Sequence, residues 1–116
     1  MSRSLGKAIE ARLAVGEPVV LVSITDAKGS TPRGTGARMV VTAAEIYGSI
    51  GGGHLEFQAI MHARRMITED RLEDAIEVTL GPDMGQCCGG RVGLNLERAD
   101  EKTAAAIIAE EAEAAR

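Results

Sequence analysis

The stretch V-V-L-V-S-I-T at residues 19–25 decides the fold. It is rich in β-branched residues and opens with an unbroken apolar run, which is typical of a central strand covered on both faces. Helical and strand patterns follow one another around it in the order α-β-β-β-α-β-β-α. The sequence therefore predicts an α+β fold, in which helices pack on a mixed β-sheet of about five strands within a single domain spanning residues 1–116.

Three segments show the spacing of amphipathic helices. The first covers residues 4–15, with Ser4 as N-cap and Gly16 as a stop signal. The second runs from about His54 to Glu69, and the third begins after Asp100, which can cap it. The apolar stripe expected on the second helix consists of Phe57, Ile60, Ala63 and Ile67.

Four further segments read as strands because they alternate or are rich in β-branched residues. They cover residues 37–42, 46–50, 75–80 and 91–97. The first two are separated only by the turn Ala43 to Glu45, which predicts a hairpin. Loops are expected at residues 26–36, 51–53 and 81–90, where glycine and proline gather.

Composition excludes several classes of protein. The 13 Lys and Arg residues are outnumbered by 17 Asp and Glu residues, and Tyr47 and Phe57 are the only aromatic side chains. A nucleic-acid partner is not expected, because such proteins need basic surfaces or aromatic stacking platforms. The sequence shows no secretory signal and no apolar run that could span a membrane. With only two adjacent cysteines, a reducing cytoplasm is the expected location.

The first glycine-rich loop is locally cationic. Lys28, Arg33 and Arg38 lie on or beside it, and no acidic residue occurs between Asp26 and Glu45. Guanidinium groups offer a rigid fork of donors that suits phosphate or carboxylate, so this loop is a candidate for an anionic ligand. The alternative is a solvated turn whose basic residues contact only water.

The second glycine-rich loop leads into a helix. Gly51, Gly52 and Gly53 precede His54, and Glu56 follows in the first turn. Free N–H groups and the positive dipole end make such a helix N-terminus a possible anion cradle. Two alternatives remain open, namely that the glycines serve only a tight turn, and that Glu56 interacts only with the helix dipole.

The third glycine-rich loop contains Gln86, Cys87 and Cys88. Two thiols in a loop of this kind could bind a soft metal, carry sulfur or contact a redox ligand, whereas the alternative is two small buried residues. A tetrahedral zinc site is not favoured, because adjacent cysteines rarely reach one ion. We expect all three loops to meet at one edge of the sheet.

The three loops resemble the XdhC/CoxI family. The matching runs are G-S-T-P-R-G-T-G-A-R-M at 29–39, G-S-I-G-G-G-H-L-E at 48–56 and G-Q-C-C-G-G-R-V at 85–92. Their order and spacing also match, and the resemblance extends from about residue 5 to residue 97. Many members carry a C-terminal Rossmann-like domain, so this chain is expected to correspond to the N-terminal domain alone.

The resemblance implies an accessory factor for molybdenum hydroxylases such as xanthine dehydrogenase or carbon monoxide dehydrogenase. Such a factor binds molybdenum cofactor (molybdopterin) as cargo, assists its sulfuration and delivers it to the apoenzyme. The implied partners are the target hydroxylase and a cysteine desulfurase, and the oligomeric state, including a homo-oligomer, stays open. The residues carried over to this chain are Ser30, Thr31, Pro32, Arg33, Arg38, Gly51, Gly52, Gly53, His54, Glu56, Gln86, Cys87 and Cys88.

Three functions remain as alternatives. The leading one is a cofactor-binding maturation factor without turnover of its own. The second is a sulfurtransferase-like enzyme that carries a persulfide on Cys87 or Cys88, and the third is a non-catalytic docking domain.

Overall fold

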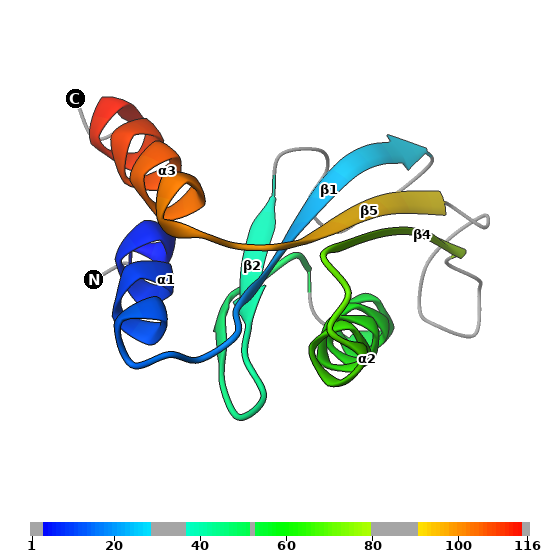
Figure 1. Cartoon of the computed structure of the whole chain (residues 1–116). Coiled ribbons are helices and arrows are strands. Elements are labelled where there is room, and N and C mark those ends of the chain that lie inside the picture. Colours follow the sequence, from blue (N-terminus) through cyan, green and yellow to red (C-terminus); the bar gives the residue numbers. More distant parts are fainter. Residues whose placement is uncertain (1–3, 29–36, 52, 80–90, 115–116) are drawn as a thin grey trace.

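The structure is a computed structural model, and it describes residues 4–28, 37–51, 53–79 and 91–114. Three helices and five strands follow the predicted order (Figure 1). The elements are α1 (Leu5–Ala14), β1 (Val20–Lys28), β2 (Arg38–Val41), β3 (Ile46–Gly48), α2 (Gly53–Glu69), β4 (Glu73–Thr79), β5 (Arg91–Arg98) and α3 (Glu101–Ala114). The predicted α+β class and the number of strands are confirmed.

The five strands form one sheet in the order β3-β2-β1-β5-β4. Strand β1 lies in its centre, as its apolar sequence predicts, and pairs with β2 on one side and β5 on the other. Strands β2 and β3 form the predicted hairpin around the turn at Ala43 to Glu45. Within that turn the Thr42 hydroxyl accepts a hydrogen bond from the Glu45 N–H at 2.9 Å.

The prediction of a mixed sheet is wrong, because every strand pairing is antiparallel. Helix α2 connects the two edge strands, β3 and β4, which run in the same direction because four antiparallel pairings separate them. They never become neighbours, since β2, β1 and β5 lie between them. Parallel strands are thus present in the chain but separated in the sheet, an outcome that the order of elements alone does not reveal.

The two faces of the sheet are covered differently. Helix α2 packs against one face, whereas α1 and α3 form a helix pair against the other (Figure 1). Alternation along β1 divides the core accordingly: Val20, Val22 and Ile24 join the cluster beneath α2, and Leu21 joins the cluster beneath α1 and α3. Below, these are called the α2 face and the α1/α3 face.

Helix α2 presents a different stripe to the sheet from the one predicted. Its buried residues are Leu55, Ala59, Ala63 and Met66. Phe57 is 57% exposed on the outer surface, while Ile60 and Ile67 are partly buried at the margin of the core. The predicted stripe shared only Ala63 with the fully buried set. The side of α2 that faces the sheet carries Leu55 and Met66, which join the same core cluster as Ile50.

Strand β1 is longer than predicted. Its ladder with β5 continues through Lys28, past an irregularity between Ile24 and Asp26, into the segment expected to be a loop. Pairing with a neighbouring strand stabilises an extended backbone that local composition would leave as a loop. The irregularity is consistent with a β-bulge, which lets the strand continue with increased twist.

The predicted helix caps are confirmed. The Ser4 hydroxyl accepts a hydrogen bond from the Lys7 N–H at 3.0 Å at the start of α1. The Asp100 carboxylate accepts one from the Thr103 N–H at 2.9 Å at the start of α3. Gly16 adopts a φ of 78° after α1, in the conformation that ends many helices. No helix in the described ranges has both the length and the apolar character needed to cross a membrane.

Candidate functional site

The three glycine-rich loops leave the sheet from the same end. In an antiparallel sheet of this order, the ends of β1, β3 and β4 and the starts of β2 and β5 share one end. Lys28 pairs with Arg91, which also pairs with Thr79, so the first and third loops begin and end in adjacent positions. The flanking strands therefore open toward the same end of the sheet, while the meeting of the loops themselves stays a prediction, because most of their residues lie outside the described ranges.

The turn between β3 and α2 is organised by Glu56. Its carboxylate accepts hydrogen bonds from the Ser49 hydroxyl, from the Ile50 N–H at 3.1 Å and from the Gly51 N–H at 3.3 Å. A carboxylate in the first turn also interacts favourably with the helix dipole. Of the alternatives for Glu56, the described contacts therefore support a structural role that ties the end of β3 to the helix that follows.

Two glycines of this turn need their conformational freedom. Gly51 has a φ of 131° and Gly53 a φ of 61°, both in regions that other residues rarely adopt. A Cβ at Gly53 would meet nothing within 4 Å, so the conformation alone requires glycine there. The turn interpretation thus accounts for Gly51 and Gly53, while Gly52 lies outside the described residues.

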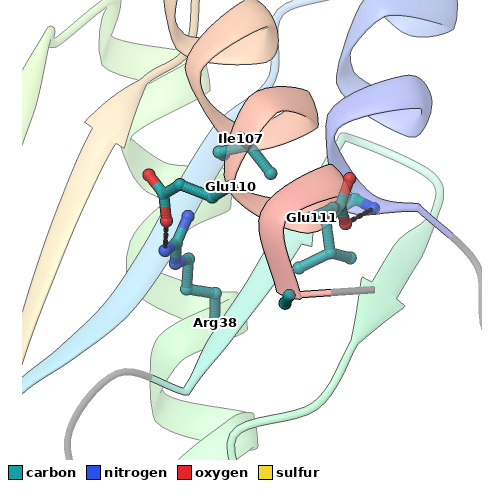
Figure 2. Close-up of a pocket in the computed structure, with 6 residues that line it drawn as sticks. Arg38, Ile107, Glu110 and Glu111 are labelled. Atoms are coloured by element: carbon teal, nitrogen blue, oxygen red, sulfur yellow. Dashed lines mark hydrogen bonds and ion pairs between the residues drawn. The ribbon is translucent and has the colours of Figure 1, made fainter. Parts of the chain in front are cut away.

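Arg38 opens β2 and faces α3. Its guanidinium forms an ion pair with Glu110, and Figure 2 shows the two side chains pointing toward each other. The neighbouring Glu111 turns the other way, toward the start of α1, and accepts a hydrogen bond from the Leu5 N–H at 2.8 Å. A pocket of about 280 Å³ lies between these groups, lined also by Ile107 and Ala114. The guanidinium of Arg38, which the sequence predicts to bind an anionic ligand, is therefore paired with the carboxylate of Glu110 in this structure.

His54 lies on the other face of the sheet. Arg38 belongs to the α1/α3 face, whereas His54 stands in the first turn of α2. The sheet thus separates two side chains that the sequence analysis assigned to one cofactor site. A ligand that contacts both must extend around the loop end of the sheet.

A second hollow lies between α2 and the edge strand β4, and is called the α2–β4 hollow below. It has a volume of about 440 Å³. Its lining residues are His54, Gln58, His62, Ile76, Glu77, Val78 and Thr79. Thr79 is the last described residue before the cysteine loop and His54 directly follows the glycine turn, so two of the three motifs begin or end near this hollow.

Eight of the residues carried over from the family are not described by the structure. They are Ser30, Thr31, Pro32, Arg33, Gly52, Gln86, Cys87 and Cys88, and their roles stay predictions. Within the described ranges, no group of three or more His, Cys, Asp or Glu side chains could hold a metal ion.

Comparison with known proteins places the chain in a family. The model of the XdhC and CoxI family matches residues 12–78, more than half of the chain. The chain belongs to the XdhC and CoxI family. The matched range includes the first two glycine-rich loops, and the cysteine loop follows it. No significant match was found among curated proteins.

The fold of this XdhC/CoxI-family chain also occurs in a solved structure. It is similar to a crystal structure described as a xanthine dehydrogenase from Bacillus halodurans, with a TM-score of 0.69 and 25% sequence identity. The similarity covers 90% of this chain and 33% of that one. The present chain thus spans about one third of the length of the protein it resembles.

Sequence reasoning missed several residues around these sites. Gln58 lies four residues after His54 and four before His62, so helical spacing could have identified it. Glu110 gave no comparable signal, because it meets Arg38 across 72 positions of the sequence. Glu77 gave no signal either, because it is one polar residue in the alternating pattern of a strand.

Proposed function

We propose that this chain is a cytoplasmic accessory factor that binds molybdenum cofactor as cargo and assists its sulfuration and insertion into a molybdenum hydroxylase. Membership of the XdhC and CoxI family suggests the accessory role. The observation that supports the proposal is the shared end of the sheet, at which the strands flanking all three motifs begin or end. The target enzyme and a cysteine desulfurase would be its partners.

Several described residues can contact chemical groups of molybdenum cofactor. Arg38 can bind an anionic group of the cargo through its guanidinium once its ion pair with Glu110 is broken. On the opposite face, the first turn of α2 and the α2–β4 hollow offer N–H groups and polar side chains. The cargo contains a phosphate and a heterocycle. Near the end of the sheet from which the loops leave, the chain therefore has a cationic side chain for the phosphate and polar side chains for the heterocycle.

The proposal is tested by isolating the protein gently from cells that make the cofactor. We expect pterin, measured by mass spectrometry, and molybdenum, measured by elemental analysis, to copurify in equal amounts. The variants Cys87→Ser and Cys88→Ser should fold normally, and at least one should lose cofactor or target activation. Lys102→Ala, exposed on α3 and far from the loop end, is the matched control.

Two results would contradict the proposed accessory function. If the wild-type chain holds no pterin and does not stimulate a target hydroxylase, the accessory function is wrong for this chain. If a cysteine becomes persulfidated by a desulfurase and passes sulfur on repeatedly while no pterin is retained, the sulfurtransferase alternative replaces the proposal.

A further inference from the structure

The last turns of α3 carry two consecutive carboxylates with different partners. Glu111 accepts hydrogen bonds from the Ser4 hydroxyl at 2.5 Å and from the Leu5 N–H at 2.8 Å, which ties α3 to the start of α1. Glu110 points the other way and forms an ion pair with Arg38 of β2 (Figure 2). Consecutive residues of a helix point about 100° apart, so one turn of α3 reaches both neighbours. The tie through Glu111 does not depend on the partner of Glu110.

Arg38 borders two hollows on this face of the sheet. One is the pocket of about 280 Å³ described above. The other, called the α3–sheet hollow below, has a volume of about 370 Å³ and is lined by Leu21, Ser23, Arg38, Glu97, Thr103, Ala106, Ile107 and Glu110. Ser23 is the register partner of Arg38 on β1, and opposite residues of an antiparallel pair point to the same face. A small anion in the α3–sheet hollow can therefore contact the guanidinium and a neighbouring hydroxyl donor.

The described contact uses only part of the guanidinium. It joins one nitrogen of Arg38, Nη2, to one oxygen of Glu110, Oε1. A guanidinium presents five N–H donors, and a phosphate group can accept two of them in parallel. A phosphate monoester also carries close to two negative charges at neutral pH, against one on a carboxylate. Phosphate is therefore a stronger partner for Arg38 than a single carboxylate oxygen.

The ion pair can be broken without moving the helix. The side chain of Glu110 is 57% exposed and that of Arg38 is 29% exposed, and an ion pair in contact with water contributes little stability. The position of α3 depends instead on the buried Ala104 and Ile107 and on the tie through Glu111. Rotation of the Glu110 side chain into solvent is enough to free the guanidinium.

We propose that Glu110 is an internal competitor for the phosphate group of the cargo at Arg38. Its carboxylate pairs with the guanidinium until a phosphate displaces it, and it pairs again when the ligand leaves. This autoinhibitory contact lowers the affinity for phosphate and so favours release of the cargo. The inference rests on the proposed function for the identity of the ligand, whereas the competition itself can be measured with inorganic phosphate alone.

The test is a calorimetric titration of the full chain with inorganic phosphate at constant ionic strength. Glu110→Gln removes the competing charge at nearly constant size, and we expect it to bind phosphate about two- to fivefold more tightly than the wild type, as removal of a partly exposed ion pair allows. Arg38→Ala should bind phosphate at least about tenfold more weakly, because it removes the charge-assisted donors.

Two matched controls separate competition from other effects. Glu97→Gln removes a carboxylate from the same hollow but, among the described contacts, no ion pair with Arg38, so its phosphate affinity should stay within about 1.5-fold of the wild type. Glu111→Gln weakens the tie to α1, so it should lower the melting temperature and leave phosphate affinity unchanged. Glu110→Gln should show the reverse, with the melting temperature of the wild type and tighter phosphate binding.

The outcomes separate this inference from the proposed function. Unchanged phosphate binding in Glu110→Gln or Arg38→Ala, or an equal gain in Glu97→Gln or Glu111→Gln, would overturn the inference even if cofactor copurifies with the wild type. A gain specific to Glu110→Gln supports the competition even if the wild type retains no pterin, in which case only the proposed function fails.

A second measurement identifies the source of the phosphate. Where the wild type retains pterin, Glu110→Gln should retain more of it after extended dialysis. Tighter binding of inorganic phosphate without greater retention of pterin would overturn the assignment to the cargo and leave free phosphate as the ligand of Arg38.

Discussion

The two faces of the sheet are stabilised in different ways. On the α2 face, one helix buries large side chains such as Leu55 and Met66 in an extensive cluster. On the α1/α3 face, a smaller cluster lies beneath two helices that approach closely at Gly6 and are joined by the side chain of Glu111. The α2 face therefore depends on apolar burial, whereas the other depends on close helix contact and polar ties.

The largest effect should come from the core of the α2 face. Leu55→Ala removes a fully buried side chain, and we expect a loss of about 3 kcal/mol in the free energy of unfolding, measured by urea denaturation. Leu72→Ala is the matched control, because Leu72 is 72% exposed. Equal losses in the two variants would contradict the comparison between buried and exposed leucines.

The contact between α1 and α3 should be sensitive to a single methyl group. A Cβ at Gly6 would lie 2.5 Å from Ile108 Cγ1 and 2.8 Å from the Ile108 backbone nitrogen, so the helices must move apart. We expect Gly6→Ala to cost about 1–3 kcal/mol in unfolding free energy despite the better helix propensity of alanine.

A second substitution sharpens this prediction. Adding Ile108→Ala removes the side-chain clash but leaves the backbone clash, so it should restore little of the lost stability. Full recovery in the double variant would show that only the Ile108 side chain, and not the distance between the helices, limits this position.

The turn before α2 should depend on the charge of Glu56. Glu56→Gln keeps the size of the side chain but weakens its hydrogen bonds to the Ser49 hydroxyl and the Ile50 and Gly51 N–H groups. We expect a loss of about 1–2 kcal/mol in unfolding free energy. Glu113→Gln, exposed on α3, should have no measurable effect. A Glu56→Gln variant of normal stability that fails to bind cofactor would instead assign Glu56 to the ligand.

The ion pair between Arg38 and Glu110 should contribute little to folding. Both groups are partly exposed, so a double-mutant cycle with Arg38→Ala and Glu110→Ala should give a coupling energy below about 1 kcal/mol that decreases with added salt. If Arg38 binds anions, Glu110→Ala should strengthen phosphate binding measured by calorimetry. A large, salt-independent coupling would assign Arg38 to the fold.

The smallest effect concerns the N-cap of α3. Hydrogen bonds from the Thr103 backbone N–H and then from its hydroxyl lower the pKa of Asp100 below its usual value. The stability from this carboxylate is therefore present above the unfolded pKa of about 4 and is lost as the pH falls through the lower folded value. Wild type should melt above Asp100→Asn at pH 7, and the difference should shrink below about pH 4. A difference independent of pH would contradict this role.

The prediction from sequence succeeded where the signal was local. Ser4, Gly16 and Asp100 marked helix ends correctly, because a cap depends on residues only a few positions away. The hairpin of β2 and β3 was also correct, since its turn joins neighbouring strands. Strand direction was predicted less well, because only packing decides which strands become neighbours, and every neighbouring pair in this sheet is antiparallel.

In the candidate site, too, features set by local sequence were predicted and features set by packing were not. The shared end of the flanking strands was predicted correctly, but the separation of Arg38 from His54 by the sheet was not. Alternation along β2 reverses the face at each residue, so a basic residue beside a loop can point to either side. The face of α2 that packs on the sheet was predicted less well for a similar reason, since the helical period allows more than one apolar side, and Phe57 lies on the surface rather than in the core.

The sequence by itself determined the class of the fold, the order of the elements, the central position of β1 and the motifs that identify the family. Each of these depends on periodicity, turn chemistry or local spacing. Only the tertiary structure decided that the sheet is antiparallel, that Glu110 engages Arg38 and that β4 closes a hollow over His54, Gln58 and His62. These features depend on contacts between distant segments, which form only when apolar surfaces are buried together and which no local pattern encodes.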